Sequence, residues 1–156
     1  MKSKVYLETT IVSYHAGSPS RDIVSAAHQR ITQEWWERRH RFDLFVSEAV
    51  VEEATRGDAV VATRRVALLS GIPVLDLSAE VHDLANRLLR GRAVPEEALV
   101  DAVHIAVTAV NQIDYLLTWN CRHIANAAVR GKIEQVCRAA GLQAPAICTP
   151  EELMEE

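Results

Sequence analysis

Short apolar runs alternate along the chain with longer segments in which apolar residues recur at the spacing of a helix. Runs of this length predict buried strands at residues 4–11, 42–47, 73–75, 115–118 and 146–148. The segments between them predict helices at residues 23–41, 48–55, 60–69, 79–90, 95–110, 124–129 and 132–140. The alternation predicts an α/β fold in three layers, with a central, mostly parallel sheet of four to five short strands flanked by helices.

Polar side chains follow two of the predicted strands at the point where each strand ends. Glu8 follows the apolar part of the first strand, and Asn120 follows the fourth. In parallel α/β sheets the ligand crevice lies outside the carboxyl ends of the strands. We therefore expect both side chains to point toward that crevice.

A single carboxylate, Asp101, lies among small apolar residues in the helix predicted at residues 95–110. The spacing within this helix predicts that Glu97, Asp101, His104 and Thr108 share one face. A lone aspartate among apolar neighbours needs a partner or a cation. Glu97 has a simpler alternative, because an acid in a first helical turn also suits the helix dipole at the surface.

A third acid, Glu53, is predicted at the edge of the apolar face of the helix at residues 48–55. If Glu8, Glu53 and Asp101 converge, each pair of charges about 4 Å apart costs roughly 4 kcal/mol at an effective dielectric near 20. Such a group needs a cation, and oxygen ligands favour Mg²⁺ or Mn²⁺. An ion of this kind activates water beside a phosphate, so phosphodiester hydrolysis is the reaction class that the pattern favours.

Length and composition limit the kind of protein this is. The 156 residues suit a single domain, which we expect to span residues 1–156. The longest apolar run is far shorter than the roughly 18 residues of a membrane span, and the first residues lack a signal-peptide pattern. We expect a cytoplasmic protein with no membrane partner. The three cysteines lack metal-site spacing and are expected to be free thiols.

The net charge of −4 argues against a uniformly basic surface for nucleic acid. Arginines are nevertheless clustered at residues 38–41, 64–65 and 87–92. An acidic total can contain a local basic groove, although each cluster is also explained as the solvated end of a helix.

At these residues the chain resembles the PIN-domain nucleases, and in particular the VapC-type toxins of bacterial toxin–antitoxin pairs. The resemblance covers about residues 4–150. Four motifs occur in the family's order: Leu7-Glu8-Thr9-Thr10, then Val46-Ser47 through Glu53 to Gly57, then Asp101-Ala102-Val103-His104-Ile105-Ala106, then Leu117-Thr118-Trp119-Asn120. Two positions depart from the family pattern, because Glu8 and Asn120 stand where aspartate is usual. We interpret these two residues as a subfamily variant.

The resemblance implies a role for each motif. Glu8, Glu53 and Asp101 would bind Mg²⁺ or Mn²⁺, and Asn120 would assist them in catalysis. The hydroxyls of Thr9 and Thr118 would orient the ligands, although β-branched residues also simply favour strands.

Three further residues are weaker candidates for the same site. Glu97 has the surface alternative given above. His104 would hold a carboxylate or contact a phosphate, with a satisfied, partly buried histidine as the alternative. Asn126 would reach the rim of the site, or would be an ordinary polar residue of its helix.

The activity that the resemblance implies is that of a metal-dependent endoribonuclease, the toxin component of a type II toxin–antitoxin pair. Its partners would be an RNA substrate, a cognate antitoxin protein and a second copy of the chain in a homodimer. The arginine clusters would contact RNA phosphates.

Other classes remain open or are disfavoured. A catalytically weak PIN-like module that binds RNA or protein is the main alternative, and Asn120 favours it. A phosphoryl-transfer receiver domain is disfavoured because the late strands supply no lysine; Lys132 lies at a helix start. A nucleotide-binding enzyme is disfavoured because no glycine-rich loop follows the first strand.

Overall fold

The structure, a computed structural model that describes residues 1–155, contains one sheet of five parallel strands in the order β3-β2-β1-β4-β5. The strands are β1 (Lys4–Leu7), β2 (Asp43–Ser47), β3 (Val74–Leu75), β4 (Tyr115–Leu117) and β5 (Ala146–Cys148). This confirms the predicted α/β fold with a central parallel sheet of short strands.

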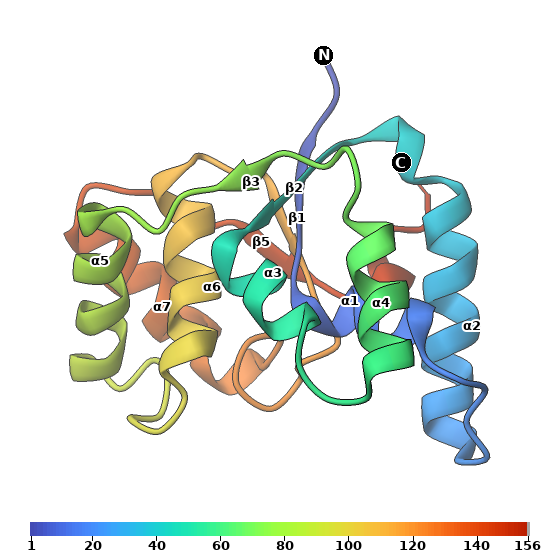
Figure 1. Ribbon diagram of the computed structural model, residues 1–156. Helices are drawn as coiled ribbons and strands as arrows, with labels where there is room; N and C mark the ends of the chain where they lie inside the picture. The colour runs from blue at the N-terminus through green and yellow to red at the C-terminus, as the bar shows by residue number, and fades with distance from the viewer. Residues whose placement is uncertain (156) are drawn as a thin grey trace.

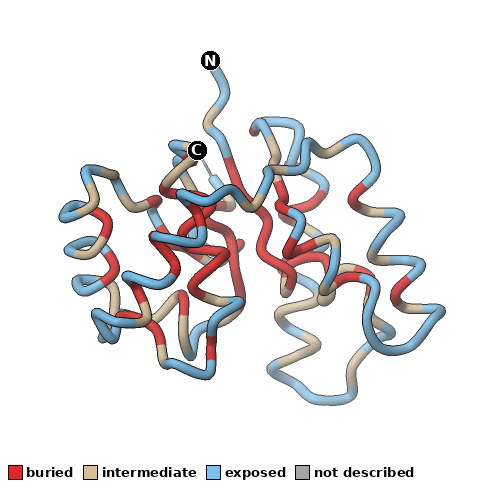
Figure 2. Tube along the Cα trace, turned by 60° about the vertical axis from the view of Figure 1, so that its left-hand side comes forward, coloured by how far each residue is buried: buried red, intermediate tan, exposed pale blue. Residues whose placement is uncertain are grey.

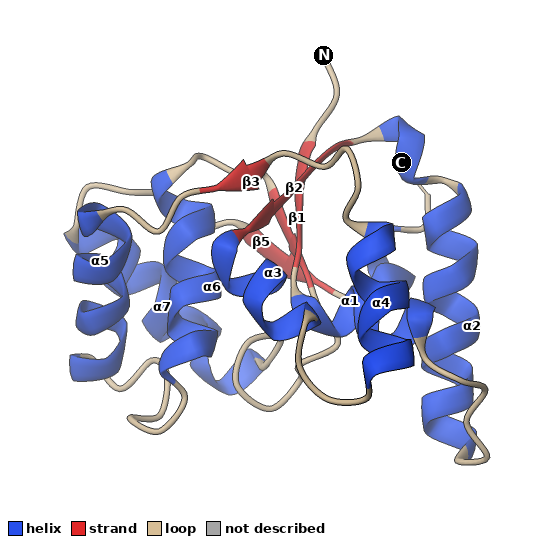
Figure 3. Cartoon of the chain, viewed as in Figure 1, coloured by secondary structure: helices blue, strands red, loops and turns tan. Residues whose placement is uncertain are grey.

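The helices lie on both sides of the sheet (Figure 1). They are α1 (Thr9–Ala16), α2 (Ile23–Glu37), α3 (Glu48–Ala54), α4 (Ala59–Leu68), α5 (Ala79–Arg90), α6 (Leu99–Val110) and α7 (Ala127–Ala139), with short 3₁₀ turns η1 (Arg39–Arg41) and η2 (Pro150–Leu153). Helices α5, α6 and α7 group on one side, and α1, α2 and α4 group on the other, with α3 between the two groups (Figure 3).

Strand β1 is the middle strand of the sheet, and its last three side chains are buried. Val5, Tyr6 and Leu7 have no exposed surface, as expected for a parallel strand covered by helices on both sides. The buried part of the chain runs through the middle of the molecule, and the exposed part follows the outer helices (Figure 2). In the register between β1 and β4, Leu7 lies opposite Leu117, so the residues that follow each strand are neighbours.

The predicted first strand at residues 4–11 is too long. The strand ends at Leu7, and Glu8 acts as the N-cap of α1, where its carboxylate accepts the backbone N–H of Thr10. The apolar residues after Glu8 gave no sign of this change, because Ile11 and Val12 are buried on a helix as they would be on a strand.

The predicted helix at residues 95–110 begins later, at Leu99, with Ala98 as its N-cap. The N–H of Ala98 donates to the carbonyl of Pro95, so residues 95–98 form a turn. Glu97 therefore lies outside α6, and the prediction that it shares one helical face with Asp101 and His104 is wrong.

The two helices predicted at residues 124–129 and 132–140 are replaced by one helix. Residues 121–126 form turns, in which the N–H of Ala125 donates to the carbonyl of Asn120. Helix α7 then begins after Asn126 and continues through residues 130 and 131, which the prediction left between the two helices.

All three cysteines are free thiols; Cys121 is exposed, while Cys137 and Cys148 are buried. Burial raises the pKa of Cys137 to about 11. Within residues 1–155, no helix has the length and apolar character needed to cross a membrane.

Gly91 ends α5 at a place where no side chain fits. A Cβ atom there would lie 2.9 Å from Cγ2 of Val136 and 3.2 Å from the carbonyl oxygen of Arg87. We predict that Gly91→Ala lowers the free energy of unfolding by about 1 to 3 kcal/mol through overpacking, as measured by urea denaturation. The double variant Gly91→Ala/Val136→Ala should recover part of this loss. If the two substitutions are simply additive, the contact with Val136 is not the cause.

Candidate metal centre

The carboxyl ends of β1 and β4 form the point where the strand order of the sheet changes direction. From β1 the chain continues to β2 and β3 on one side, and then crosses to β4 on the other side. Ligand sites of open α/β sheets lie at such switch points. Glu8 follows β1 here, and residues 118–120 follow β4.

Glu8 is 3% exposed and is held through one of its two carboxylate oxygens. Oε1 accepts from the backbone N–H of Thr10 at 3.2 Å, from the hydroxyl of Thr10, and from the hydroxyl of Thr118 at 2.6 Å. Among the described residues, none donates to Oε2. Glu8 is therefore fixed from one side and has a second oxygen that could bind a ligand.

Glu53 reaches the same place from α3, the helix that begins after β2. Its Oε1 accepts from the hydroxyl of Thr9 at 2.6 Å and lies 2.7 Å from Nε2 of His104. Ser47 starts α3 by accepting the N–H of Ala49. The sequence of strand, capping serine and short helix thus brings this acid to the carboxyl edge of the sheet.

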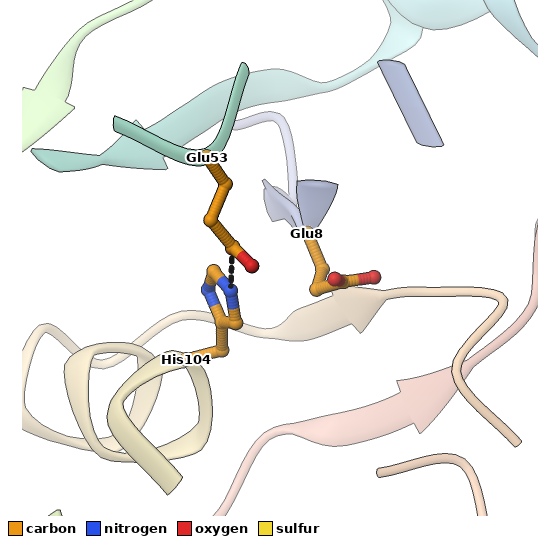
Figure 4. A group of neighbouring side chains, drawn as sticks. All are labelled: Glu8, Glu53 and His104. Atoms are coloured by element: carbon orange, nitrogen blue, oxygen red, sulfur yellow. Dashed lines mark hydrogen bonds and ion pairs between the residues drawn. The ribbon is translucent and has the colours of Figure 1, made fainter. Parts of the chain in front are cut away.

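His104 has no exposed surface, and its two ring nitrogens contact Glu53 on one side and a buried tyrosine on the other. Its Nδ1 lies 2.6 Å from the hydroxyl of Tyr6, which in turn lies 2.8 Å from the hydroxyl of Ser47. Figure 4 shows the carboxylate of Glu53 and the imidazole of His104 meeting, with Glu8 beside them. One ligand atom from each of Glu8, Glu53 and His104 lies within 4.8 Å of the others, close enough to surround one metal ion.

The proximity of these groups changes their proton affinities. Burial by itself lowers the pKa of His104, but the hydrogen bond to Glu53 and the charges of Glu8, Glu53 and Asp101 outweigh burial and leave it raised. Burial would raise the pKa of Glu53, but the hydrogen bonds and charge of His104 and the bond from Thr9 leave it lowered. Both directions favour an ionised Glu53 beside a proton-bearing His104.

Asp101 belongs to an adjacent group of side chains. It lies in the first turn of α6, where its Oδ1 accepts from Nδ2 of Asn120 at 3.1 Å and its Oδ2 lies 2.9 Å from Nδ1 of His123. The Oδ1 of Asn120 accepts the backbone N–H of His123 at 3.0 Å. Asn120 is therefore hydrogen-bonded through both polar atoms of its amide and helps to orient Asp101.

The predicted site residues fall into three sets. Glu8, Glu53 and His104 come together, with Thr9 and Thr118 each donating to one of the acids. Asp101 and Asn120 form the adjacent group. Two candidates lie apart: Glu97 is exposed in the turn before α6, and Asn126 caps α7 by accepting the N–H of Ala128.

Sequence reasoning missed three contributors: Tyr6, Thr10 and His123. Tyr6 looked like an ordinary apolar strand residue, and no pattern revealed its hydroxyl contacts. Thr10 lies two residues after Glu8, and His123 lies three residues after Asn120. A hydroxyl or imidazole side chain two or three residues after a predicted site residue was therefore the sequence signal that could have identified Thr10 and His123.

The donor set fits a hard divalent cation. Glu8 and Glu53 supply carboxylate oxygens at one point, where His104 also lies, and Asp101 carries a third carboxylate in the adjacent group. Each acid is already oriented by hydroxyl, amide or imidazole groups, which is how ligands are held around metals in proteins. Carboxylate oxygens are the ligands of Mg²⁺ and Mn²⁺.

Comparisons with known proteins identify the fold. Neither a protein-family model nor a curated protein matches the sequence. The structure is similar to VapC20 of Mycobacterium tuberculosis, a toxin that cleaves the sarcin–ricin loop; the TM-score is 0.59 at 17% identity, over 90% of this chain and 99% of that one. It is also similar to a chain of VapBC2 from Rickettsia felis, solved bound to promoter DNA; the TM-score is 0.56 at 13% identity, over 94% and 98% of the chains. The chain therefore has the fold of VapC-type PIN proteins.

We predict that the contact between Glu53 and His104 makes stability depend on pH in the metal-free protein. The lowered pKa of Glu53 stabilises the fold above its ordinary value of about 4.5, and this is lost as pH falls through the folded pKa. The raised pKa of His104 stabilises the fold below its ordinary value of about 6.5, and this is lost as pH rises through the folded pKa. The contribution should be largest between these values.

Urea denaturation with EDTA at pH 3, 5.5 and 8.5 measures this effect. Glu53→Gln should lose most stability relative to wild type at pH 5.5 and less at the other two values. Glu52→Gln is the matched control, because Glu52 is exposed and pairs with Arg56. An equal loss for Glu53→Gln at all three pH values would contradict the assignment.

Proposed function

We propose that this chain is a metal-dependent endoribonuclease of the VapC type, the toxin component of a type II toxin–antitoxin pair, with residues 1–156 forming one PIN-like domain. The observation that supports this most directly is the convergence of Glu8 and Glu53 at the switch point of a fold shared with VapC toxins. The cofactor would be Mg²⁺ or Mn²⁺, held by Glu8, Glu53 and Asp101. When bound, it would supply an activated water and neutralise charge that develops on the scissile phosphate.

The protein's own part in the reaction is to hold three carboxylates in place. Thr118 fixes Glu8, and Thr9 and His104 fix Glu53. Asn120 and His123 fix Asp101. Ligands held in this way need no reorganisation when the phosphate arrives, which lowers the cost of reaching the transition state.

The substrate would approach over the carboxyl edge of the sheet. A small hollow of about 140 Å³ lies beside Glu53, lined mainly by apolar side chains of α3 and α6 and by Arg56. Arg56 lines this hollow, and Arg90 and Arg92 lie between α5 and α6, whose first turn carries Asp101; we propose that these three arginines contact phosphates. Arg39 and Arg41 precede β2 and so lie at the opposite, amino edge of the sheet, which removes this cluster from the proposed RNA contacts.

The proposed partners are single-stranded or looped RNA, a cognate antitoxin and a second copy of the chain, all in the cytoplasm. The two structural neighbours support the first two, since one is a toxin that cleaves the sarcin–ricin loop and the other was solved in VapBC2 bound to promoter DNA. A small neighbouring reading frame that encodes a DNA-binding head and a flexible tail would support the antitoxin assignment.

The second candidate function is a PIN-like module that binds RNA or protein and cleaves slowly or not at all. Asn120 supports it, because an amide replaces a carboxylate and both its polar atoms are already engaged. One fewer negative charge lowers the affinity of a carboxylate site for a divalent cation.

We predict that Asp101→Asn abolishes Mn²⁺-dependent cleavage of a mixed RNA pool, with a loss of at least about 100-fold. The substitution keeps the shape of the side chain and removes the charge that the cation and the phosphate require. Gel analysis of the RNA fragments measures cleavage, and Glu97→Gln is the control, because Glu97 is exposed outside α6. If wild type and Asp101→Asn cleave at the same rate, the nuclease proposal is wrong and the binding module is favoured.

We predict that Asn120→Asp tightens Mn²⁺ binding by about tenfold, since the number of ligand charges sets affinity. Without a cation the same substitution should lower the free energy of unfolding by about 1 to 2 kcal/mol, because a second carboxylate then faces Asp101. Calorimetric titration and urea denaturation measure the two effects.

Asn126→Asp is the matched control for this experiment. Asn126 caps α7, and aspartate caps helices equally well, so neither quantity should change. Unchanged Mn²⁺ affinity in Asn120→Asp would show that position 120 does not face the ion.

A further inference from the structure

Four side chains form a buried chain of polar contacts that ends at Glu53. The hydroxyl of Ser47 lies 2.8 Å from that of Tyr6, which lies 2.6 Å from Nδ1 of His104, and Nε2 of His104 lies 2.7 Å from Oε1 of Glu53. Ser47, Tyr6 and His104 have no exposed surface. No water competes for these groups, so each donor must have an acceptor within the chain.

The order of donors and acceptors follows from Glu53. An ionised carboxylate only accepts, so Nε2 of His104 must hold the hydrogen between them. In a neutral imidazole Nδ1 is then an acceptor, so the hydroxyl of Tyr6 donates to it and that of Ser47 donates to Tyr6. Ser47 in turn accepts the N–H of Ala49, and every group is satisfied. A protonated imidazole also keeps the hydrogen on Nε2; its Nδ1 then donates to the hydroxyl of Tyr6, which donates to that of Ser47.

We propose that Tyr6 is a positioning residue, which makes His104 a hydrogen-bond donor to Glu53 rather than a ligand of the metal. This inference rests on the proposed function, because it concerns the same cation. The distances alone would allow Nε2 to bind an ion together with Glu8 and Glu53. To do so, Nε2 must lose its hydrogen, and Glu53 then loses its bond to His104.

The donor arrangement has a consequence for the choice of metal. With His104 turned into a donor, the ion meets carboxylate oxygens only, which suits Mg²⁺ and Mn²⁺. With His104 as a ligand, the mixed nitrogen and oxygen set would favour zinc and similar ions. Tyr6, in the middle of β1, therefore influences the metal without touching it.

The first test reads the tautomer of His104 directly. Long-range ¹H–¹⁵N spectra of protein with ¹⁵N-labelled histidine distinguish a nitrogen that holds a hydrogen from one that accepts. We expect Nε2 to hold the hydrogen in the metal-free protein and to keep it when Mg²⁺ is added. Loss of that hydrogen on addition of Mg²⁺ would overturn the proposal.

The second test measures Mn²⁺ affinity from the electron paramagnetic resonance signal of the free ion. Tyr6→Phe keeps the ring and removes the hydroxyl, and we expect it to weaken Mn²⁺ binding about 10-fold or more, the usual effect of removing a group that orients a ligand. Tyr115→Phe is the matched control, since Tyr115 is the first residue of β4 and lies at the amino end of the strands, away from the carboxyl end where Glu8 lies. Equal affinity of wild type and Tyr6→Phe would overturn the proposal.

Substitutions of His104 separate positioning from folding. His104→Gln retains an N–H donor for Glu53, whereas His104→Leu retains none. We expect Gln to bind Mn²⁺ within a few fold of wild type and Leu to bind at least about tenfold more weakly, with circular dichroism confirming that both fold. Equal losses in the two folded variants would assign His104 to the metal as a ligand. A wild type that binds no Mn²⁺ would instead defeat the proposed function, and this inference with it.

Discussion

The repulsion between a buried and a partly buried carboxylate at one edge of the sheet is the constraint on which the site depends. Glu8 follows the end of β1 and is buried, and Glu53 lies on α3 and is partly buried. Like charges at this separation oppose folding unless other groups offset them. Hydroxyl groups of Thr9 and Thr118 and the imidazole of His104 provide that offset in the metal-free protein.

The rest of the fold serves to bring these compensating groups to the acids. The parallel register of β1 with β4 places Thr118 beside Glu8, and the N–H of Glu8 donates to the carbonyl of Leu117 to fix that alignment. Helix α6 crosses the same edge with His104 buried and Asp101 partly open to solvent. The carboxylates are therefore fixed by elements distant in sequence, as a pre-organised site requires.

The sequence was sufficient to predict the sheet, its parallel strands and the order of the acids along the chain, because apolar runs and strand ends are local signals. It was insufficient for the contacts of Glu8, which changes the path of the chain by capping a helix that looked like more strand. It also missed Tyr6 and His123, because their roles depend on which residues the fold brings opposite them. The sequence did not show that α6 begins only at Leu99, because Glu96 and Glu97 in the preceding turn resemble the acids of a first helical turn.

Glu8 has two roles, because the same carboxylate caps α1 and would bind the proposed ion. Helix α1 packs against both α2 and α4, so its first turn supports a whole layer of the molecule. Evolution at position 8 is therefore restricted in a particular way. A change to aspartate or serine keeps a good cap while altering charge or reach, whereas a change to an apolar residue removes both the helix cap and a ligand of the proposed ion.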